Sequence, residues 1–304
     1  MISLNQLRYA VALSDEKSMN TAAAKLFISQ PSLSNSIKEL EAEVGIEIFR
    51  RMSRGVSLTP EGVEFIGYAK QVLEQYSLIE SRYISHESVR DRFALSTQHY
   101  SFVVEAFVKL VQLYGMDEYD LAVKETKTFE VISDVRDFQS EMGVLYENDF
   151  NRKVLEKIFT ENNLSFHPLF DCRIFVYLWK GHPLSKKKKI KIEELAEYPC
   201  LSFSQGQNNS FYFSEEVLST YEYKRTIKAN DRATMLNLMK GLKGYTLCSG
   251  IISEDLNGND YCAIPLDSKE KMTIGYIKRK GIPLSPIAGK YLEILSVYKD
   301  QVLI

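Results

Sequence analysis

Short polar side chains recur at helical spacing between residues 29 and 38 of this 304-residue chain. At 100° per residue, a helix over 31–43 places Ser34, Asn35 and Lys38 nearly opposite a stripe of leucine and isoleucine. Hydroxyl, amide and ammonium groups can hydrogen-bond to base edges and phosphates in a DNA groove. An ordinary amphipathic helix in a globular core is the alternative, but this polar face lacks the Glu/Lys pairs of a solvated surface.

Arginines gather just after this segment, in a stretch that predicts a β-hairpin. Arg50, Arg51 and Arg54 lie among alternating strand-forming residues around a turn at Arg54-Gly55. Such a hairpin, or wing, would hold phosphates locally even though the net charge of the chain is −2. The predicted DNA contacts are Thr21, Ser29, Gln30, Pro31, Ser32, Ser34, Asn35, Lys38, Arg51 and Arg54.

A second group of polar side chains lies in loops that each follow a predicted strand and precede a predicted helix. There are four such loops. Ligands of open α/β sheets bind beyond the carboxyl ends of the strands, and helix N-termini offer free N–H groups to an anion. We therefore expect a small-molecule effector there, with a carboxylate, sulfate or phosphate as suitable groups. The alternative is that these residues are only helix N-caps, which is the favoured role of Asp231. The predicted effector-binding residues are Thr97, Gln98, His99, Tyr100, Ser101, Thr128, Ser202, Phe203, Ser204 and Asn230.

The sequence contains none of the common catalytic or nucleotide-binding motifs, such as GxSxG, HExxH, a P-loop or GxGxxG after a strand. Its four cysteines are widely spaced and form no Cys-x-x-Cys pair. We therefore expect no catalytic residues, no metal site and no cofactor, and buried free thiols in a cytoplasmic, reducing location. Without a long apolar run or a signal-peptide start, neither membrane contact nor export is expected.

The elements that must position the first polar group are two short helices joined by a tight turn. Helices are predicted over 21–27 and 31–43, with Ser29 or Gln30 as N-cap of the second and Gly45 at its end. Small alanines at positions 22 and 23 let the two helices cross closely, as a helix-turn-helix requires.

A long helix is predicted next, with Thr59 as its N-cap, Pro60 in its first turn and Tyr83 near its end. Its apolar residues recur at steps of three and four, and the sequence offers no domain of its own to cover them. Pairing with a second copy of the helix is the favoured interpretation, and packing against a neighbouring domain is the alternative. A polar hinge is predicted at 85–88.

Beyond Arg92, strands alternate with helices, which indicates parallel α/β sheets arranged in two lobes. A helix is expected over 211–219, and the final helix, 286–298, should return to the first lobe. The predicted domains are 1–59 (winged helix-turn-helix), 60–90 (linker helix and hinge) and 91–304 (effector domain). Within the last, lobe I comprises 91–166 plus 270–304, and lobe II comprises 167–269.

Residues 1–90 resemble the N-terminal region of the LysR-type transcriptional regulators. The resemblance rests on motifs in the expected order, including Thr21-Ala22-Ala23, Ser29-Gln30-Pro31-Ser32-Leu33-Ser34 and Leu58-Thr59-Pro60-Glu61-Gly62. It implies an α/β protein with a winged helix-turn-helix, a linker helix and a two-lobed effector domain like a periplasmic binding protein. It also implies promoter DNA as a partner, a small effector, and a homodimer that associates to a homotetramer.

Position 35 departs from the pattern of that family, which often has arginine where this chain has Asn35. Asparagine pairs naturally with adenine and arginine with guanine, so base preference is expected to differ at this step.

The function predicted from these observations is sequence-specific DNA binding that is modulated by an effector held between the two lobes. The alternative is a non-catalytic small-molecule-binding module whose N-terminal helices mediate protein assembly. A sequence-preferring, salt-sensitive complex with DNA would distinguish the first from the second.

Overall fold

The computed structural model describes residues 1–52, 55–83, 91–114 and 118–299. They form two compact units, Met1–Arg90 and Asp91–Ile304, which are described separately. The division falls at the predicted end of the linker, and the predicted hinge at 85–88 lies outside the described residues.

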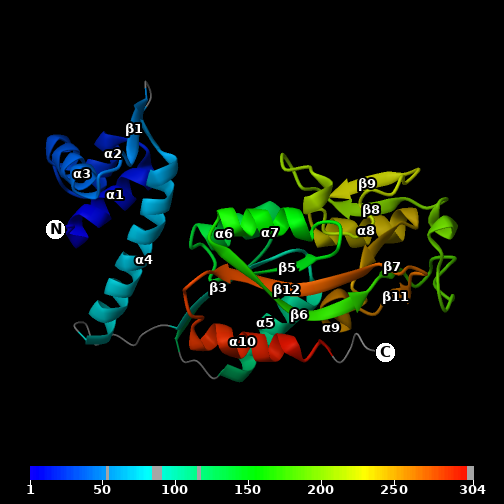
Figure 1. The fold of residues 1–304 in the computed structure, drawn as a ribbon. Helices are drawn as coiled ribbons and strands as arrows, with labels where there is room; N and C mark the ends of the chain where they lie inside the picture. Colours follow the sequence, from blue (N-terminus) through cyan, green and yellow to red (C-terminus); the bar gives the residue numbers. More distant parts are fainter. Residues whose placement is uncertain (53–54, 84–90, 115–117, 300–304) are drawn as a thin grey trace. The chain divides into compact units, whose positions relative to one another are not determined.

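The first unit contains three helices, a β-hairpin and a long fourth helix (Figure 1). The bounds are α1 Leu4–Glu16, α2 Met19–Lys25, α3 Gln30–Val44, β1 Phe49–Met52, β2 Gly55–Leu58 and α4 Pro60–Tyr83. The expected caps are present, since the Ser29 hydroxyl accepts a hydrogen bond from the Ser32 amide (3.2 Å) and Gly45 ends α3 with a φ of 74°. The Thr59 hydroxyl likewise accepts from the Gly62 amide at 2.8 Å, so α4 begins where the sequence predicts.

One apolar core holds these elements together. The predicted stripe of α3 is buried, with Leu33, Ile37 and Leu40 no more than 2% exposed. Gly62 permits α4 to approach the segment before the hairpin, because a Cβ there would lie 2.1 Å from the carbonyl oxygen of Ile48. A larger residue at position 62 would therefore separate α4 from the winged domain.

The second unit begins with a five-stranded sheet, lobe I, whose strand order is β4-β3-β5-β12-β6. In Figure 1, α6 and α7 cover one face of this sheet, and α5 and α10 lie on the other. The return of the final helix to this lobe is confirmed, since the Tyr291 hydroxyl donates to the carbonyl of Val103 on α5 (3.0 Å). The bounds are β3 Asp91–Thr97, α5 Ser101–Tyr114, β4 Tyr119–Glu125, α6 Thr128–Arg136, β5 Met142–Glu147, α7 Arg152–Glu161, β6 Leu164–Arg173, β12 Lys271–Arg279 and α10 Pro286–Ser296.

Lobe II is a second five-stranded sheet, in the order β11-β7-β10-β8-β9, and α8 packs on it. Strands β6 and β7, and then β11 and β12, carry the chain between the two sheets. The bounds are β7 Phe175–Trp179, η1 Ile192–Leu195, β8 Cys200–Phe203, η2 Phe211–Phe213, β9 Thr226–Ala229, α8 Arg232–Leu242, β10 Tyr245–Cys248, α9 Glu254–Asn257 and β11 Tyr261–Pro265. One apolar cluster, which contains Phe102 of lobe I and Val176 of lobe II, extends through both lobes.

Three expectations about this unit are wrong in detail. Both sheets are mixed, because β12 runs antiparallel to β5 and β6, and β7 runs antiparallel to β10 and β11. The predicted boundary at 166/167 cuts through β6, all of which belongs to the lobe I sheet, so the first crossing between lobes lies after Arg173. The expected helix over 211–219 is only the short turn η2, because backbone carbonyls of this stretch bond to lobe I instead of to a following helical turn.

Candidate functional site

The exposed side of α3 presents five of the ten predicted DNA contacts. Gln30, Ser32, Asn35 and Lys38 are exposed, as is Pro31 in the first turn. Amide and ammonium side chains on one accessible helix face match the donor and acceptor pattern of the major groove. This surface, Gln30–Asn35–Lys38 with its neighbours, is called the reading face below.

Two other predicted contacts have roles within the fold. The Ser29 hydroxyl caps α3, and the exposed Thr21 donates a hydrogen bond to the Ser18 hydroxyl (3.2 Å). Neither role prevents a contact with phosphate, since both residues lie at the accessible start of a helix.

Ser34 does not lie on the reading face as expected. It is only 8% exposed, because three residues of helix place it within about 60° of the buried Ile37, at the edge of the buried stripe. The outward placement of its side chain was wrong, and the reading face is narrower than the sequence suggests.

The hairpin β1–β2 has the antiparallel register expected of a wing, with Arg51 opposite Val56. Glu41 of α3 anchors its first strand by accepting hydrogen bonds from the amides of Ile48 (2.8 Å) and Phe49 (2.9 Å). The backbone of Arg51 lies in β1, whereas its side chain and the whole of Arg54 lie outside the described part of the structure. The predicted phosphate contacts of these two arginines therefore remain predictions.

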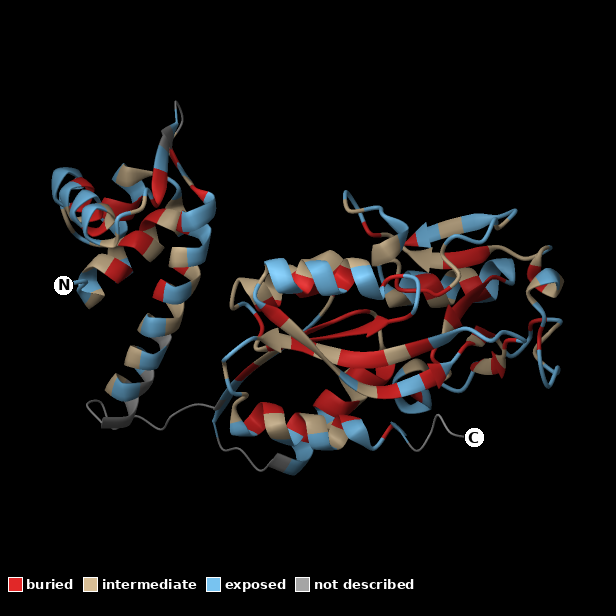
Figure 2. Ribbon diagram, in the orientation of Figure 1, coloured by how far each residue is buried: buried red, intermediate tan, exposed pale blue. Residues whose placement is uncertain are grey.

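Helix α4 carries apolar side chains that its own unit leaves uncovered, as Figure 2 shows by the exposed and intermediate colours along much of its length. Val72 is 46% exposed and Ile79 is 54% exposed. They line a shallow groove together with Tyr76 of the same helix and Leu4 of α1. Nearer the start of α4 the predicted stripe is not uncovered as expected, since Ile66 is buried in the core of its own unit.

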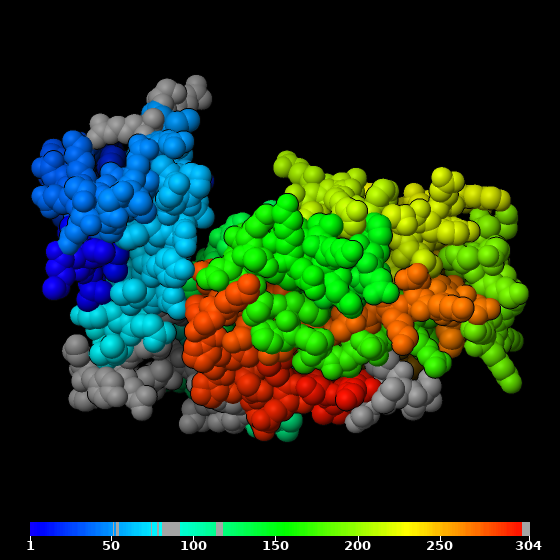
Figure 3. Space-filling model, in the orientation of Figure 1, coloured from blue at the N-terminus to red at the C-terminus, as the bar shows by residue number. Residues whose placement is uncertain are grey.

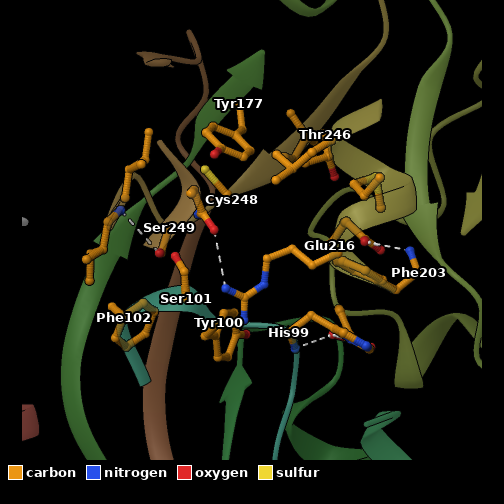
Figure 4. Close-up of a pocket in the computed structure, with 18 of the residues that line it drawn as sticks. His99, Tyr100, Ser101, Phe102, Tyr177, Phe203, Glu216, Thr246, Cys248 and Ser249 are labelled. Carbon is orange, nitrogen blue, oxygen red and sulfur yellow. Dashed lines mark hydrogen bonds and ion pairs between the residues drawn. The ribbon is translucent and has the colours of Figure 1, made fainter. Parts of the chain in front are cut away.

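A cavity in the second unit lies between the start of α5, which belongs to lobe I, and α8 and β10 of lobe II (Figure 4). Its volume is about 80 Å³. Figure 4 shows Tyr100, Ser101 and Phe102 at one side and the lobe II residues Tyr177 and Thr246 across from them. A molecule bound here would touch both lobes at once.

The N-terminus of α5, the predicted anion site, already has a carboxylate of the protein beside it. Glu215 accepts hydrogen bonds from the His99 amide (2.9 Å) and from the Gln205 side chain (2.9 Å). The His99 ring approaches the same carboxylate, with 2.8 Å between Nδ1 and Oε2, and stacks on Phe203 at 3.9 Å between centroids. An effector carboxylate bound at the start of α5 would lie beside the carboxylate of Glu215, which is bonded two residues before the helix begins.

Glu216 lies next to Glu215 and is also buried, at 8% exposure. Its carboxylate accepts one hydrogen bond, from the Phe203 amide (2.8 Å). Burial, together with the charge of Glu215, raises the pKa of Glu216 to about 8. Glu216 is therefore mostly neutral at pH 7.

Arg232, at the start of α8, forms a second link between the lobes. Its guanidinium pairs with Glu125 at the end of β4 and approaches the Asn257 amide oxygen at 3.4 Å. The adjacent Asp231 is the N-cap of α8, as expected, and accepts a hydrogen bond from the Thr234 amide (2.8 Å). The end of β4 and the start of α8 are thus joined by a partly buried ion pair.

Residues 205–216 of lobe II, called the cross-lobe segment here, bond to lobe I at several further points. The Thr128 hydroxyl donates to the Phe213 carbonyl (2.7 Å), and the Tyr146 hydroxyl donates to the Ser214 carbonyl (3.0 Å). On the face shown in Figure 3, lobe I surface drawn in green meets the lobe II surface drawn in yellow. The cross-lobe segment therefore bonds the two lobes together.

Four of the ten predicted effector residues line the cavity, namely His99, Tyr100, Ser101 and Phe203. The side chains of Gln98 and Thr128 are instead bonded to each other at 2.6 Å and are no more than 1% exposed. Thr97 is fully buried. The remaining predicted residues, Ser202, Ser204 and Asn230, are not among those that line the cavity.

Sequence reasoning missed the lobe II side of the cavity. Arg232 could have been predicted as a site residue, because it directly follows Asp231, which the sequence identified as a helix N-cap. Tyr177 and Thr246 lie inside strands, where the sequence marks them only as strand formers. Glu215 and Glu216 lie in the stretch predicted to be helical, so their position gave no sign of a site.

The cysteines are free in the described structure, and Cys172 and Cys200 are buried. Burial raises the pKa of the Cys172, Cys200 and Cys248 thiols to about 12, so they carry almost no thiolate at neutral pH. Within the described residues, no group of three or more His, Cys, Asp or Glu side chains is arranged to hold a metal ion. None of the described helices has the length and apolar character needed to cross a bilayer.

Two family models match the chain. The model described as "Bacterial regulatory helix-turn-helix protein, lysR family" matches residues 4–63, and "LysR substrate binding domain" matches residues 95–297. Together they cover both units described above.

Individual relatives match along most of their length. The Escherichia coli (strain K12) protein "Uncharacterized HTH-type transcriptional regulator YbhD" is 23% identical over 298 residues, which are 96% of this chain and 90% of that protein. A "Hydrogen peroxide-inducible genes activator" of Pectobacterium carotovorum is 21% identical over 99% of this chain and 97% of its own. The fold is similar to that of full-length OxyR from Pseudomonas aeruginosa, with a TM-score of 0.66, 21% identity, and coverage of 100% of this chain and 96% of that one.

Proposed function

Because the chain belongs to the LysR family of DNA-binding transcriptional regulators, we propose that its reading face enters the major groove and that the inter-lobe cavity receives the effector. The observation that carries the proposal is the exposed polar side of α3, where Gln30, Asn35 and Lys38 are accessible together. The amides would read base edges, and Lys38 would contribute to phosphate binding along with the wing arginines Arg51 and Arg54. We place this DNA binding in the cytoplasm.

We further propose that two copies of the chain pair through α4 and that the dimers associate to tetramers. The exposed Val72 and Ile79 support this, since burying such side chains between two helices is favourable. Paired reading faces would then bind two half-sites related by a two-fold axis.

Effector binding would alter DNA binding through the contacts between the lobes. A ligand in the cavity lies against His99 and Phe203, and close to the Arg232–Glu125 pair, which joins the lobes. For regulation, the ligand must bind one arrangement of the lobes more tightly than another. A ligand that raises the melting temperature but leaves the DNA footprint unchanged would contradict this coupling.

The DNA part of the proposal is tested by an electrophoretic shift with the full chain and sequences selected from a random pool. We expect a sequence-preferring complex that weakens as salt rises. Gln30→Ala should reduce discrimination between selected and random DNA, because it removes a base-reading amide. A matched control is Lys157→Ala, an exposed lysine of α7 in the effector unit, which should leave binding unchanged. If the parent protein shows no preference among sequences, the assignment of the reading face fails.

A further inference from the structure

The charged groups around the inter-lobe cavity are already compensated by other groups of the protein. Arg232 pairs with Glu125, and Glu215 accepts hydrogen bonds from the amide of His99 and the side chain of Gln205 while facing the His99 ring. Glu216, whose pKa burial raises to about 8, adds no charge at pH 7. A charged ligand would therefore be desolvated here without a free counter-charge, which is costly in a buried site.

Three buried polar atoms around the same cavity have no hydrogen-bond partner within the described structure. They are the hydroxyl oxygens of Tyr177 and Thr246 and Nε of Arg232, and the side chain of Asn257 lies near the Tyr177 hydroxyl. Tyr177 is 8% exposed and Thr246 is 7% exposed, so water does not readily satisfy them. All three groups can donate a hydrogen bond, and the guanidinium N–H can do nothing else.

The two hydroxyl groups are brought together by the sheet of lobe II. Thr246 of β10 lies directly opposite Tyr177 of β7 in the antiparallel register. Directly opposed residues project from the same face of a sheet. Figure 4 shows both side chains at the lobe II end of the cavity. Each of the two hydroxyls is therefore presented on the side of the sheet that lines the cavity.

The rest of the cavity wall is mainly apolar. Met235 and Met239 of α8 and Met272 of β12 contribute thioether side chains, and Phe102 contributes an aromatic ring. The volume of about 80 Å³ is small, but unbranched methionine side chains can shift to admit a ring. A mainly apolar ligand body fits these surroundings.

We propose that this cavity binds a compact, uncharged molecule with an apolar, ring-sized body and one hydrogen-bond-accepting oxygen, such as an aromatic ketone or amide. The oxygen is placed at the hydroxyls of Tyr177 and Thr246, and the ring lies among the methionines. This inference rests on the proposed function, in which the cavity is the effector site. It replaces the anion expected from the sequence, because an anion in this cavity would lie beside the carboxylate of Glu215.

Three probes of similar size separate the possibilities when titrated into the full-length protein. Acetophenone is uncharged with an acceptor oxygen, benzoate is anionic, and ethylbenzene is uncharged without an acceptor. Binding is followed by calorimetry and by the ¹³C-methyl resonances of the methionines, with Met142 in the lobe I core as an internal control. We expect acetophenone to bind most tightly and to shift the resonances of Met235, Met239 and Met272 while that of Met142 is unchanged.

Two substitutions test the placement of the oxygen. Thr246→Val and Tyr177→Phe should each weaken acetophenone binding by about fivefold, as the loss of one hydrogen bond predicts, and should leave ethylbenzene binding unchanged. Tyr223→Phe is the control, since this lobe II tyrosine already donates to the Leu218 carbonyl (3.2 Å) and lies outside the cavity. Even if a variant folds poorly, the methionine resonances of the unsubstituted protein show whether acetophenone binds in the cavity.

The inference is overturned if benzoate binds as tightly as acetophenone, if none of the probes shifts the cavity methionines, or if both substitutions leave acetophenone binding unchanged. Its failure is distinguishable from failure of the proposed function. DNA binding with no response of the cavity to any probe contradicts only the ligand assignment. Acetophenone binding without a sequence-preferring DNA complex contradicts only the assignment of the reading face.

Discussion

At the scale of single residues, exposure on α3 separates groups that the sequence presents as equivalent. Ser34 and Asn35 are adjacent polar residues, but Ser34 is buried at the edge of the core whereas Asn35 is exposed. A 100° turn between neighbours is enough to move a side chain from the helix surface into the interface with the core. Asn35 is therefore the better candidate for reading a base.

We predict that Asn35→Arg changes base preference without preventing DNA binding. The asparagine amide can pair with adenine, whereas the guanidinium pairs with guanine, so selected sites should change at one position of each half-site. Selection from random DNA followed by sequencing measures this. Lys38→Ala serves as the contrast, because losing a phosphate contact should weaken binding to all sequences and reduce the salt slope by about 1. An unchanged preference in the arginine variant would show that residue 35 does not face a base.

At the scale of elements, the cross-lobe segment has the largest influence on the site. It contains little regular structure, yet it places Glu215 at the start of α5 and Glu216 beside Phe203. Its backbone is held by side chains of lobe I, including the hydroxyls of Thr128 and Tyr146. A segment held by tertiary contacts rather than by its own helical bonds is a suitable point for an effector to act on.

We predict that Glu216 makes stability depend on pH. Its folded-state pKa of about 8 lies above that of an unfolded glutamate, so the folded state binds more protons between roughly pH 4.5 and 8. Its contribution is present in full below this range and is lost as pH rises through 8. Glu216→Gln is uncharged at every pH, so its free energy of unfolding relative to the parent should increase by roughly 1 kcal/mol per pH unit from pH 5 to 8.

Urea unfolding at several pH values checks this expectation. Glu147, whose pKa is also raised by burial, to about 7, contributes equally to both proteins and cancels in the difference. Glu222→Gln, at an exposed position after the cross-lobe segment, is the matched control and should show a constant difference. A constant difference for Glu216→Gln as well would mean that Glu216 is ionised in the folded protein.

At the scale of the whole molecule, α4 must find a partner for its uncovered apolar side chains. Val72 and Ile79 are seven residues apart and so lie on nearly the same side of the helix, as in paired helices. Two copies joined there would double the phosphate contacts available to a chain whose overall charge is slightly negative.

We predict that Val72→Glu combined with Ile79→Glu dissociates the dimer. Two carboxylates on each helix would have to be desolvated between like charges, so the mass measured by light scattering should fall to half that of the parent assembly or less. DNA affinity should fall with it, because one reading face contacts only one half-site. Ser77→Glu, on the opposite side of α4, should leave both the mass and the affinity unchanged. A double variant that keeps its mass would place the interface elsewhere.

The sequence by itself determined the local elements of the first unit. The Ser29 and Thr59 caps, the Gly45 end of α3 and the buried stripe all follow from side-chain chemistry within a few residues. The effector unit was predictable only in its fold class. Strands β6, β11 and β12 lack a strong local signal and are stabilised by pairing with strands far away in the chain.

The cavity is the part of the protein that the sequence predicted least well. Only the tertiary structure decided that Glu215 bonds to the amide of His99 just before α5, that Arg232 pairs with Glu125, and that two hydroxyl-bearing residues lie opposite each other on neighbouring strands. Burial and long-range pairing set these positions, and neither is encoded in the spacing of nearby residues.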